Sequence, residues 1–204
     1  MTFVVFHGSF GSPKENWFPY LAENLRSIGQ EVIIPQMPTE NYEEFEKLGT
    51  KAVAKNQNLN NWLKTFEKIL PKLKDKRLCF VGHSIGCVFI LHAVNKFNLQ
   101  LDSAIFVAPF LDKLNPELIP FNIVNDSFYY DKFNFTKLKK LIPLSYAVYS
   151  DNDPYVDIKQ SLKFADKMNC QKIIHRGGGH LGDIFYQGFH LIEELCKTRI
   201  ESLD

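Results

Sequence analysis

Short apolar runs alternate along the chain with longer segments in which apolar residues recur every three or four positions. A continuous apolar run is typical of a buried strand, and the longer spacing is typical of an amphipathic helix. The predicted strands cover residues 3–6, 32–34, 78–81, 104–107, 146–149 and 172–174, and the predicted helices cover residues 17–28, 59–70, 85–94, 158–168 and 184–195. Continuous apolar strands that alternate with helices indicate a mostly parallel, doubly wound sheet with helices on both faces. We therefore predict one α/β domain over residues 1–204.

Two stretches depart from this alternation. Residues 39–58 are polar, and residues 110–144 are rich in Phe, Tyr and Asn. An insertion between two strands of such a sheet commonly lies over the carboxyl edge, where ligands bind. The second stretch is therefore predicted to form a small cap or pocket wall, or else a helix and loop that only close the core. Pro71 is expected to end or kink the second predicted helix.

Composition excludes several classes of protein. Hydrophobic residues make up 45% of the 204 positions, which is enough for a sizeable core. The formal charge is +1, so electrostatics favours neither nucleic acid nor an anionic membrane as a partner. No apolar stretch approaches the ~20 residues that span a bilayer, and the amino terminus lacks the basic region of a signal peptide. The expected location is the cytoplasm, where four scattered cysteines without a CxxC pair would be reduced thiols.

The main chemical motif is Gly82-His83-Ser84-Ile85-Gly86. It follows a predicted strand and opens a predicted helix, which is the context that a nucleophile elbow requires. In such a turn the serine hydroxyl lies above the sheet edge, and the glycines avoid clashes with the neighbouring strand and helix. Ser84 is therefore the predicted nucleophile, and the alternative is a purely structural glycine-rich turn.

A serine hydroxyl needs a base to become a good nucleophile. Of six histidines, His180 follows the last predicted strand and three glycines, so it would lie on a loop at the carboxyl edge. His180 is the predicted base, with His175 as the alternative.

The acid that orients the base is expected after the strand at 146–149. Asp153 fits best because Asp-Pro turns the chain into the next helix, and Asp151 is the alternative. Ordinary turn chemistry would also explain these aspartates. The chain order Ser, Asp, His is the α/β-hydrolase order.

The oxyanion hole should use the backbone N–H of Ile85 and a second N–H from the loop after the first strand. Either Ser9 or Phe10 is the predicted second donor, and His7 is expected to shape this loop. Zinc-type ligand spacing, GxxxxGK and GxGxxG are all missing from the sequence, so we expect neither a metal nor a cofactor. Candidate substrate contacts, each equally explained as ordinary core, are His7, Trp17, Phe110, Phe128, Phe10 and the aromatic residues between 121 and 135.

The chain resembles the small YdeN-like hydrolases, a group related to the retinoblastoma-binding serine hydrolase of animals. The shared pieces are, in chain order, His7-Gly8, Asn16-Trp17-Phe18-Pro19 with Leu21, Met37-Pro38, Gly82-His83-Ser84-x-Gly86, Asp153-Pro154 and Gly179-His180. The resemblance implies an α/β-hydrolase fold with a minimal cap or none, a Ser84-Asp153-His180 triad and esterase-type activity. Residues 39–58 and 110–144 depart from the family pattern and are expected to reshape the substrate pocket.

These observations predict a serine hydrolase that cleaves small carboxylic esters or amides through an acyl-enzyme intermediate. Peptidase or acyltransferase chemistry on the same triad is a rival. The alternative from another class is a non-catalytic scaffold that binds a protein or a ligand. The sequence identifies no protein partner.

Overall fold

Six parallel strands form the centre of the protein in this computed structural model, which describes residues 1–130, 132–182 and 188–201. Their order across the sheet is β2-β1-β3-β4-β5-β6, and every neighbouring pair is parallel. The bounds are β1 Thr2–Phe6, β2 Glu31–Ile33, β3 Leu78–His83, β4 Ser103–Val107, β5 Leu144–Ser150 and β6 Gln171–His175. Strands β1, β3 and β4 are buried along their whole length, which explains their continuous apolar runs.

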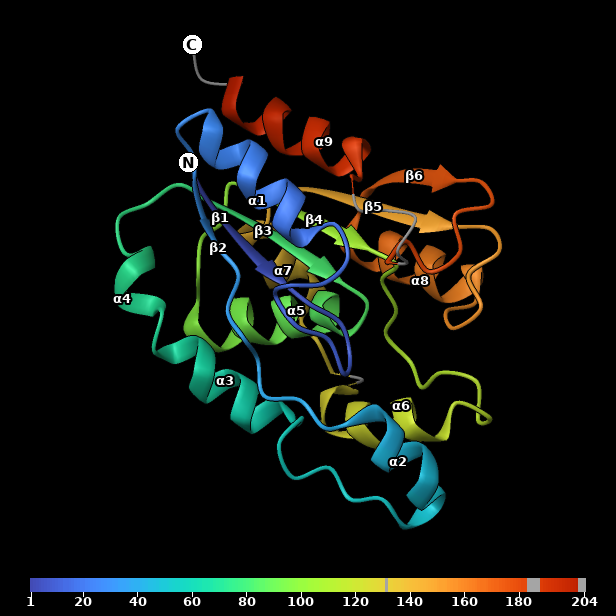
Figure 1. The fold of residues 1–204 in the computed structure, drawn as a ribbon. Coiled ribbons are helices and arrows are strands. Elements are labelled where there is room, and N and C mark those ends of the chain that lie inside the picture. The colour runs from blue at the N-terminus through green and yellow to red at the C-terminus, as the bar shows by residue number, and fades with distance from the viewer. Residues whose placement is uncertain (131, 183–187, 202–204) are drawn as a thin grey trace.

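Helices cover both faces of this sheet (Figure 1). On one face lie α1 (Phe18–Ser27) and α9 (His190–Glu201), which contact each other. The other face carries α3 (Leu59–Glu67), α4 (Leu70–Leu73), α5 (Ile85–Phe97), α7 (Phe135–Leu141) and α8 (Ile158–Met168). Two separate apolar clusters fill the two sides of the sheet. The doubly wound α/β architecture is thus confirmed.

The strand order changes direction at β1, because the chain passes from β1 to β2 on one side and then crosses to β3 on the other. Ligands of open parallel sheets bind at the carboxyl ends of strands around such a switch point. Here those ends lead into His7 and Ser84, which follow β1 and β3 directly.

Two helix boundaries differ from the sequence prediction. The helix predicted over 59–70 ends at Glu67, and Pro71 lies in the first turn of α4, where its missing N–H costs no hydrogen bond. Helix α9 begins at His190, so Gly188, which was predicted to lie within the last helix, precedes it. Ile184, the predicted start, lies outside the described residues.

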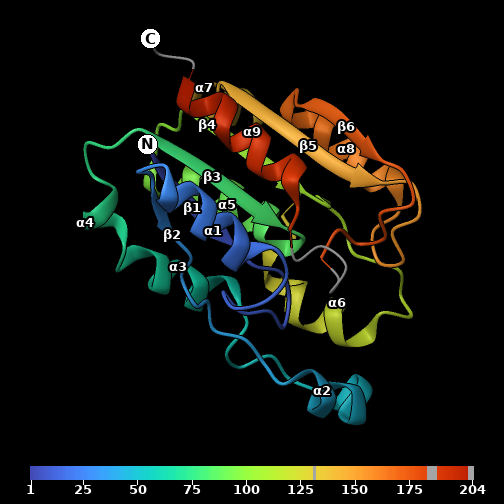
Figure 2. The ribbon, with the colours of Figure 1, turned by 45° about the horizontal axis from the view of Figure 1, so that its top comes forward.

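The two stretches that break the alternation form a small cap. Helix α2 (Tyr42–Leu48) and the 3-10 turn η1 (Gly49–Lys51) come from the first stretch, and α6 (Ile119–Asn125) and the 3-10 turn η2 (Asp126–Phe128) from the second. Both views place α2 and α6 beyond the arrowheads of the strands (Figures 1 and 2). A third apolar cluster joins them through Phe45, Ala52 and Val124. Of the stretch 110–144, residues 119–128 lie over the strand ends, whereas α7 packs on a face of the sheet and closes the core there.

Among the described residues, no helix has both the length and the apolar character needed to cross a bilayer.

Candidate active site

Ser84 occupies the sharp turn between β3 and α5. Its backbone has φ 56° and ψ −123°, a left-handed conformation that is strained for a residue with a Cβ. The turn is held by backbone hydrogen bonds, since Ser84 N donates to Val107 O at 2.9 Å and Cys87 N donates to Ser84 O at 3.0 Å. The Ile85 amide follows directly at the first turn of α5. This is the conformation of a nucleophile elbow.

The glycines on either side of Ser84 are required by close backbone contacts. A Cβ on Gly82 would lie 2.9 Å from the backbone N of Cys87. A Cβ on Gly86 would lie 2.6 Å from the carbonyl oxygen of Phe6, in β1. Only glycine lets the turn and the first turn of α5 approach their neighbours this closely.

Asp153 and His180 form a buried hydrogen bond beside this turn. The Nδ1 of His180 lies 2.8 Å from Oδ2 of Asp153, and the side chains are 15% and 3% exposed. The other carboxylate oxygen, Oδ1, accepts the backbone N–H groups of Tyr155 at 2.8 Å and Val156 at 3.0 Å. The hydrogen bonds to Oδ1 therefore hold the carboxylate in place, and Oδ2 is the oxygen that contacts the imidazole.

Three consecutive side chains, from the last residue of β5 and the two residues after it, hold the glycine loop that carries His180. The backbone N–H groups of residues 177, 178 and 179 donate to Asp151 Oδ1, Ser150 Oγ and Asn152 Oδ1, at 2.8, 2.9 and 2.8 Å. Asp151, the alternative acid, also lies 3.8 Å from Arg176. Asp151 thus stabilises the loop, while Asp153 contacts the histidine.

The His180 loop is attached to the elbow through His83. The Nε2 of His83 donates to the carbonyl oxygen of His180 at 2.9 Å, and the two rings are 4.8 Å apart. The indole N–H of Trp17 donates to Leu181 O at 2.8 Å. Burial lowers the pKa of His83 to about 3, so its imidazole is neutral. Because His83 precedes Ser84, these contacts attach the His180 loop to the turn that carries Ser84.

The loop after β1 lies against the elbow from the other side. A Cβ on Gly8 would be 3.2 Å from the Cβ of Ser84. His7 shapes this loop, since its Nδ1 donates to Gly8 O at 2.8 Å and its Nε2 accepts the backbone N–H of Met37 at 3.1 Å. Burial lowers the pKa of His7, which keeps the imidazole neutral for both bonds.

Two further residues, which no motif or pattern in the sequence indicated, also bind this loop. The backbone N–H of Phe10 donates to Oε1 of Gln57 at 2.9 Å, and the hydroxyl of Ser9 donates to Oδ1 of Asn125 at 2.7 Å. Gln57 and Asn125 are fully buried. They come from the segment before α3 and the end of α6, so their position depends on tertiary packing and carries no periodic signal.

The remaining predicted substrate contacts are core residues in this structure. Trp17, Phe110, Phe128 and His7 have no exposed surface. Trp17 packs on Phe18 with ring centroids 4.6 Å apart, and Phe128 packs on Trp62 at 5.0 Å. Packing accounts for all four, and a contact with substrate stays a prediction. His175, the alternative base, ends β6 with its ring 5.7 Å from that of Phe189.

A row of partly exposed aromatic rings adjoins His180. The Tyr155 ring is 5.0 Å from the imidazole of His180, the Phe121 ring is 5.3 Å from Tyr155, and the Phe10 ring is 5.4 Å from Phe121. We refer to Phe10, Phe121 and Tyr155 as the aromatic row. The row runs from the ring of His180 to the loop after β1.

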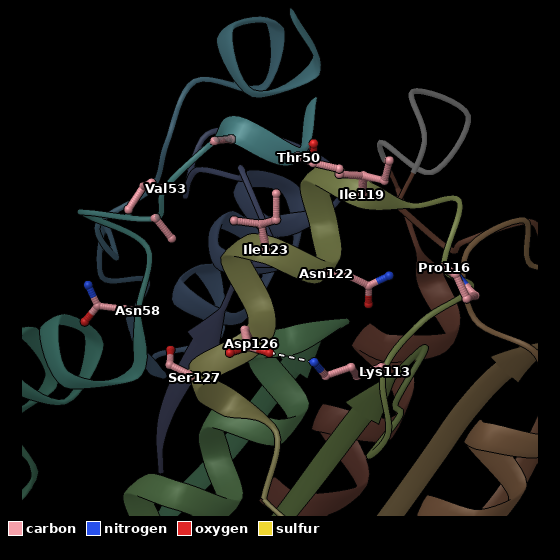
Figure 3. A pocket seen from close by; sticks show the side chains of 12 residues that line it. Thr50, Val53, Asn58, Lys113, Pro116, Ile119, Asn122, Ile123, Asp126 and Ser127 are labelled. Carbon is pink, nitrogen blue, oxygen red and sulfur yellow. Dashed lines mark hydrogen bonds and ion pairs between the residues drawn. The ribbon is translucent and has the colours of Figure 1, made fainter. Parts of the chain in front are cut away.

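A cavity of about 550 Å³ lies on another side of the cap and contains none of the predicted catalytic residues (Figure 3). Helix α6 separates it from the elbow. Its residues 119, 122 and 123 line the cavity together with Asp126 of η2, whereas Phe121 and Asn125 of the helix contact the loop after β1. An ion pair between Lys113 and Asp126, 2.8 Å long, crosses one end of the cavity.

Comparison with known proteins identifies the family and the fold of the chain. The family described as Serine hydrolase matches residues 3–195 of the chain. The YdeN protein of Bacillus subtilis (strain 168) is 25% identical over 178 residues, which cover 86% of this chain and 83% of that protein. The crystal structure of the B. subtilis ydeN gene product superposes with a TM-score of 0.80 at 22% identity, covering 98% of each chain. Est1E from Butyrivibrio proteoclasticus with ferulic acid bound superposes with a TM-score of 0.69 at 19% identity, covering 98% of this chain and 87% of Est1E. The resemblance to YdeN-like hydrolases and the α/β-hydrolase fold are confirmed.

Proposed function

Because the chain belongs to the serine hydrolase family, we propose that it cleaves carboxylic esters, with Ser84 as nucleophile, His180 as base and Asp153 as the group that orients the base. The observation that carries this proposal is the 2.8 Å hydrogen bond between Asp153 and His180, on a loop bonded to the residue before Ser84. Asp153 occupies Nδ1, which leaves Nε2 as the atom that accepts the serine proton.

The reaction has two steps. In the first, Nε2 of His180 takes the proton of Ser84 Oγ, which attacks the ester carbonyl. The resulting tetrahedral intermediate collapses, the proton passes to the leaving alcohol, and an acyl-enzyme remains. In the second, water attacks the acyl group in the same way, and the acid and free Ser84 are released. The buried carboxylate of Asp153 stabilises the imidazolium formed in each step.

The oxyanion hole is assigned to the backbone N–H groups of Ile85 and Ser9. Ile85 N–H lies at the first turn of α5, where the helix dipole also favours negative charge. Of the two donors predicted for the loop after β1, the Phe10 amide already donates to Gln57. Ser9 is therefore the donor that we propose. A missing oxyanion donor typically lowers kcat by roughly 10²–10³.

The test is labelling with a fluorophosphonate, followed by intact-mass analysis. Wild type should gain one adduct, and neither Ser84→Ala nor His180→Ala should gain it. Ser12→Ala, in the loop after β1, is the matched serine control and should label like wild type. A folded wild type that gains no adduct would favour the non-catalytic scaffold instead. Ester turnover that persists in Ser84→Ala would also contradict the proposal.

A further inference from the structure

We propose that the aromatic row binds the substrate, and that the preferred substrates are esters that carry an uncharged aromatic ring. This inference rests on the proposed esterase function and adds the class of substrate. Each end of the row contacts a group of the proposed machinery. Tyr155 packs against the ring of His180, and Phe10 directly follows Ser9 in the oxyanion loop.

The rings of the row are available to a ligand, unlike most aromatic rings of the protein. Tyr155 is 37% exposed, and Phe10 and Phe121 are partly exposed. Large phenylalanines that only fill the core, such as Phe6 and Phe80, have no exposed surface. When an apolar ligand covers these partly exposed rings, apolar surface is removed from water, and this stabilises the complex of enzyme and ligand.

The geometry of the row favours a flat ring over an alkyl chain. Phe121 meets Phe10 edge to face with ring centroids 5.4 Å apart, and it meets Tyr155 in a tilted arrangement at 5.3 Å. Another aromatic ring can extend this arrangement and gain an edge-to-face contact beyond the area that it buries. Among the three side chains the one polar group is the Tyr155 hydroxyl, so the row itself offers no charge to pair with an ionic substrate.

The experiment compares kcat/KM for aromatic and aliphatic esters of similar size. Ethyl cinnamate against ethyl octanoate tests an aromatic acid, and phenethyl acetate against octyl acetate tests an aromatic alcohol. Wild type should prefer the aromatic member of at least one pair by about tenfold, which is the effect of one or two edge-to-face contacts. The pair that shows the preference identifies the part of the ester, acid or alcohol, that contacts the aromatic row.

Tyr155→Ala should reduce the preference about fivefold or more, and Tyr155→Phe should keep it. Tyr130→Ala is the matched control, because Tyr130 is 46% exposed but packs on His92 and Phe133. Wild type without a preference would overturn the inference. So would a Tyr155→Ala variant that loses aromatic and aliphatic turnover equally, since Tyr155 would then act through His180. Labelling of Ser84 in wild type separates this failure from failure of the esterase proposal.

An independent network leads us to infer that Gln57 and Asn125 are positioning residues for the oxyanion hole, again on the basis of the proposed function. The side-chain oxygen of Gln57 accepts the Phe10 N–H at 2.9 Å, and its Nε2 donates to Asn125 Oδ1 at 3.4 Å. The same Asn125 oxygen accepts the Ser9 hydroxyl at 2.7 Å. Ser9 and Phe10, in the loop after β1, are thus both hydrogen-bonded to residues of the cap.

This loop needs such support because Phe10 has φ 57°, a strained conformation for a residue with a side chain. The hydrogen bond to Gln57 stabilises that conformation and engages the Phe10 amide, which leaves the Ser9 amide for the oxyanion. Gln57 is in turn held by Glu40, whose carboxylate accepts the backbone N–H groups of Lys55 and Gln57 at 2.6 and 3.3 Å.

Gln57→Met keeps the length of the side chain but removes the acceptor. It should lower kcat by 10- to 100-fold and change KM less than about threefold, because the oxyanion forms only in the transition state. Gln57→Glu keeps an acceptor for the Phe10 N–H and should recover part of the lost kcat.

Asn134→Ala is the stability control, since it removes the side-chain cap of α7 and contacts no part of the site. It should lower the melting temperature and leave kcat unchanged. If Gln57→Met lowers the melting temperature as Asn134→Ala does and leaves kcat at the wild-type value, Gln57 is only structural and the inference is wrong.

Discussion

At the scale of single residues, Asp151 and Asp153 show how two similar side chains acquire different tasks. They lie in one turn after β5, and both accept backbone hydrogen bonds. Asp153 has a second oxygen directed at His180 and is 3% exposed, whereas Asp151 is 37% exposed and contacts the glycine loop and Arg176. The difference in burial makes the charge of Asp153 more effective toward the imidazole.

Asp153→Asn should therefore lower ester kcat by roughly 10³–10⁴-fold, because an amide neither fixes the required tautomer of His180 nor stabilises the imidazolium. Asp151→Asn keeps an oxygen for the Gly177 N–H and should stay within about threefold of wild type. Steady-state kinetics of the two variants on one ester checks this. Equal losses in both variants would contradict the assignment of Asp153.

At the scale of elements, the elbow depends on how closely α5 approaches β1. The carbonyl oxygens of Phe6 and His7 lie 2.6 and 2.8 Å from the place where a Cβ on Gly86 would be. These are backbone atoms, so a side chain there cannot be accommodated by a rotamer change. The first turn of α5 would have to move away from the sheet.

Gly86→Ala should lower the free energy of unfolding by about 2–4 kcal/mol, since it forces this overlap. Gly177→Ala is the control for backbone strain alone, because Gly177 has φ 68° and nothing within 4 Å of the new methyl group. It should cost about 1–2 kcal/mol. Urea unfolding measures both values. A Gly86→Ala variant as stable as Gly177→Ala would show that α5 can shift at little cost.

At the scale of the whole molecule, buried histidines link stability to pH. Burial lowers the pKa of His7, His83 and His92, and that of His83 falls to about 3 from its ordinary 6.5. Between pH 6.5 and about pH 3, His83 is protonated in the unfolded chain but neutral in the folded one. The free energy of unfolding therefore decreases as the pH falls through this range. For His83 alone the decrease between pH 6.5 and pH 5 is about 2 kcal/mol.

His83→Gln should remove this contribution and flatten the pH dependence of stability below pH 6.5. His190→Gln, which changes a side chain that is 76% exposed, is the control. Urea unfolding at pH 7, 6 and 5 gives the slopes. The same slope in wild type and His83→Gln would contradict a neutral buried His83.

The four cysteines give a second whole-molecule prediction. All are buried free thiols, and burial raises the pKa of Cys79 to about 12 and that of Cys170 to about 11. A thiol reagent such as Ellman's reagent should react slowly with the folded protein and should titrate four thiols in urea. Rapid reaction of any thiol in the folded state would show that its surroundings open readily.

The sequence by itself determined the sheet, the two helical layers and the elbow. Apolar periodicity reports burial directly, and the Gly82 to Gly86 motif constrains its own backbone, so both signals are local. The order of Ser84, Asp153 and His180 was also readable, because the strand ends that carry them are fixed by the same periodicity. Helix α2 was not predicted from the sequence. Phe45 is its single buried residue, so the segment has no apolar periodicity.

Only the tertiary structure decided how the cap and the site fit together. The contact of Phe10 with Gln57 spans 47 positions and that of Ser9 with Asn125 spans 116, and polar contacts at such distances leave no pattern in the sequence. The aromatic row likewise joins the loop after β1, α6 and the loop after β5. Local pattern therefore determined where chemistry could occur, whereas packing between distant segments determined which side chains surround it.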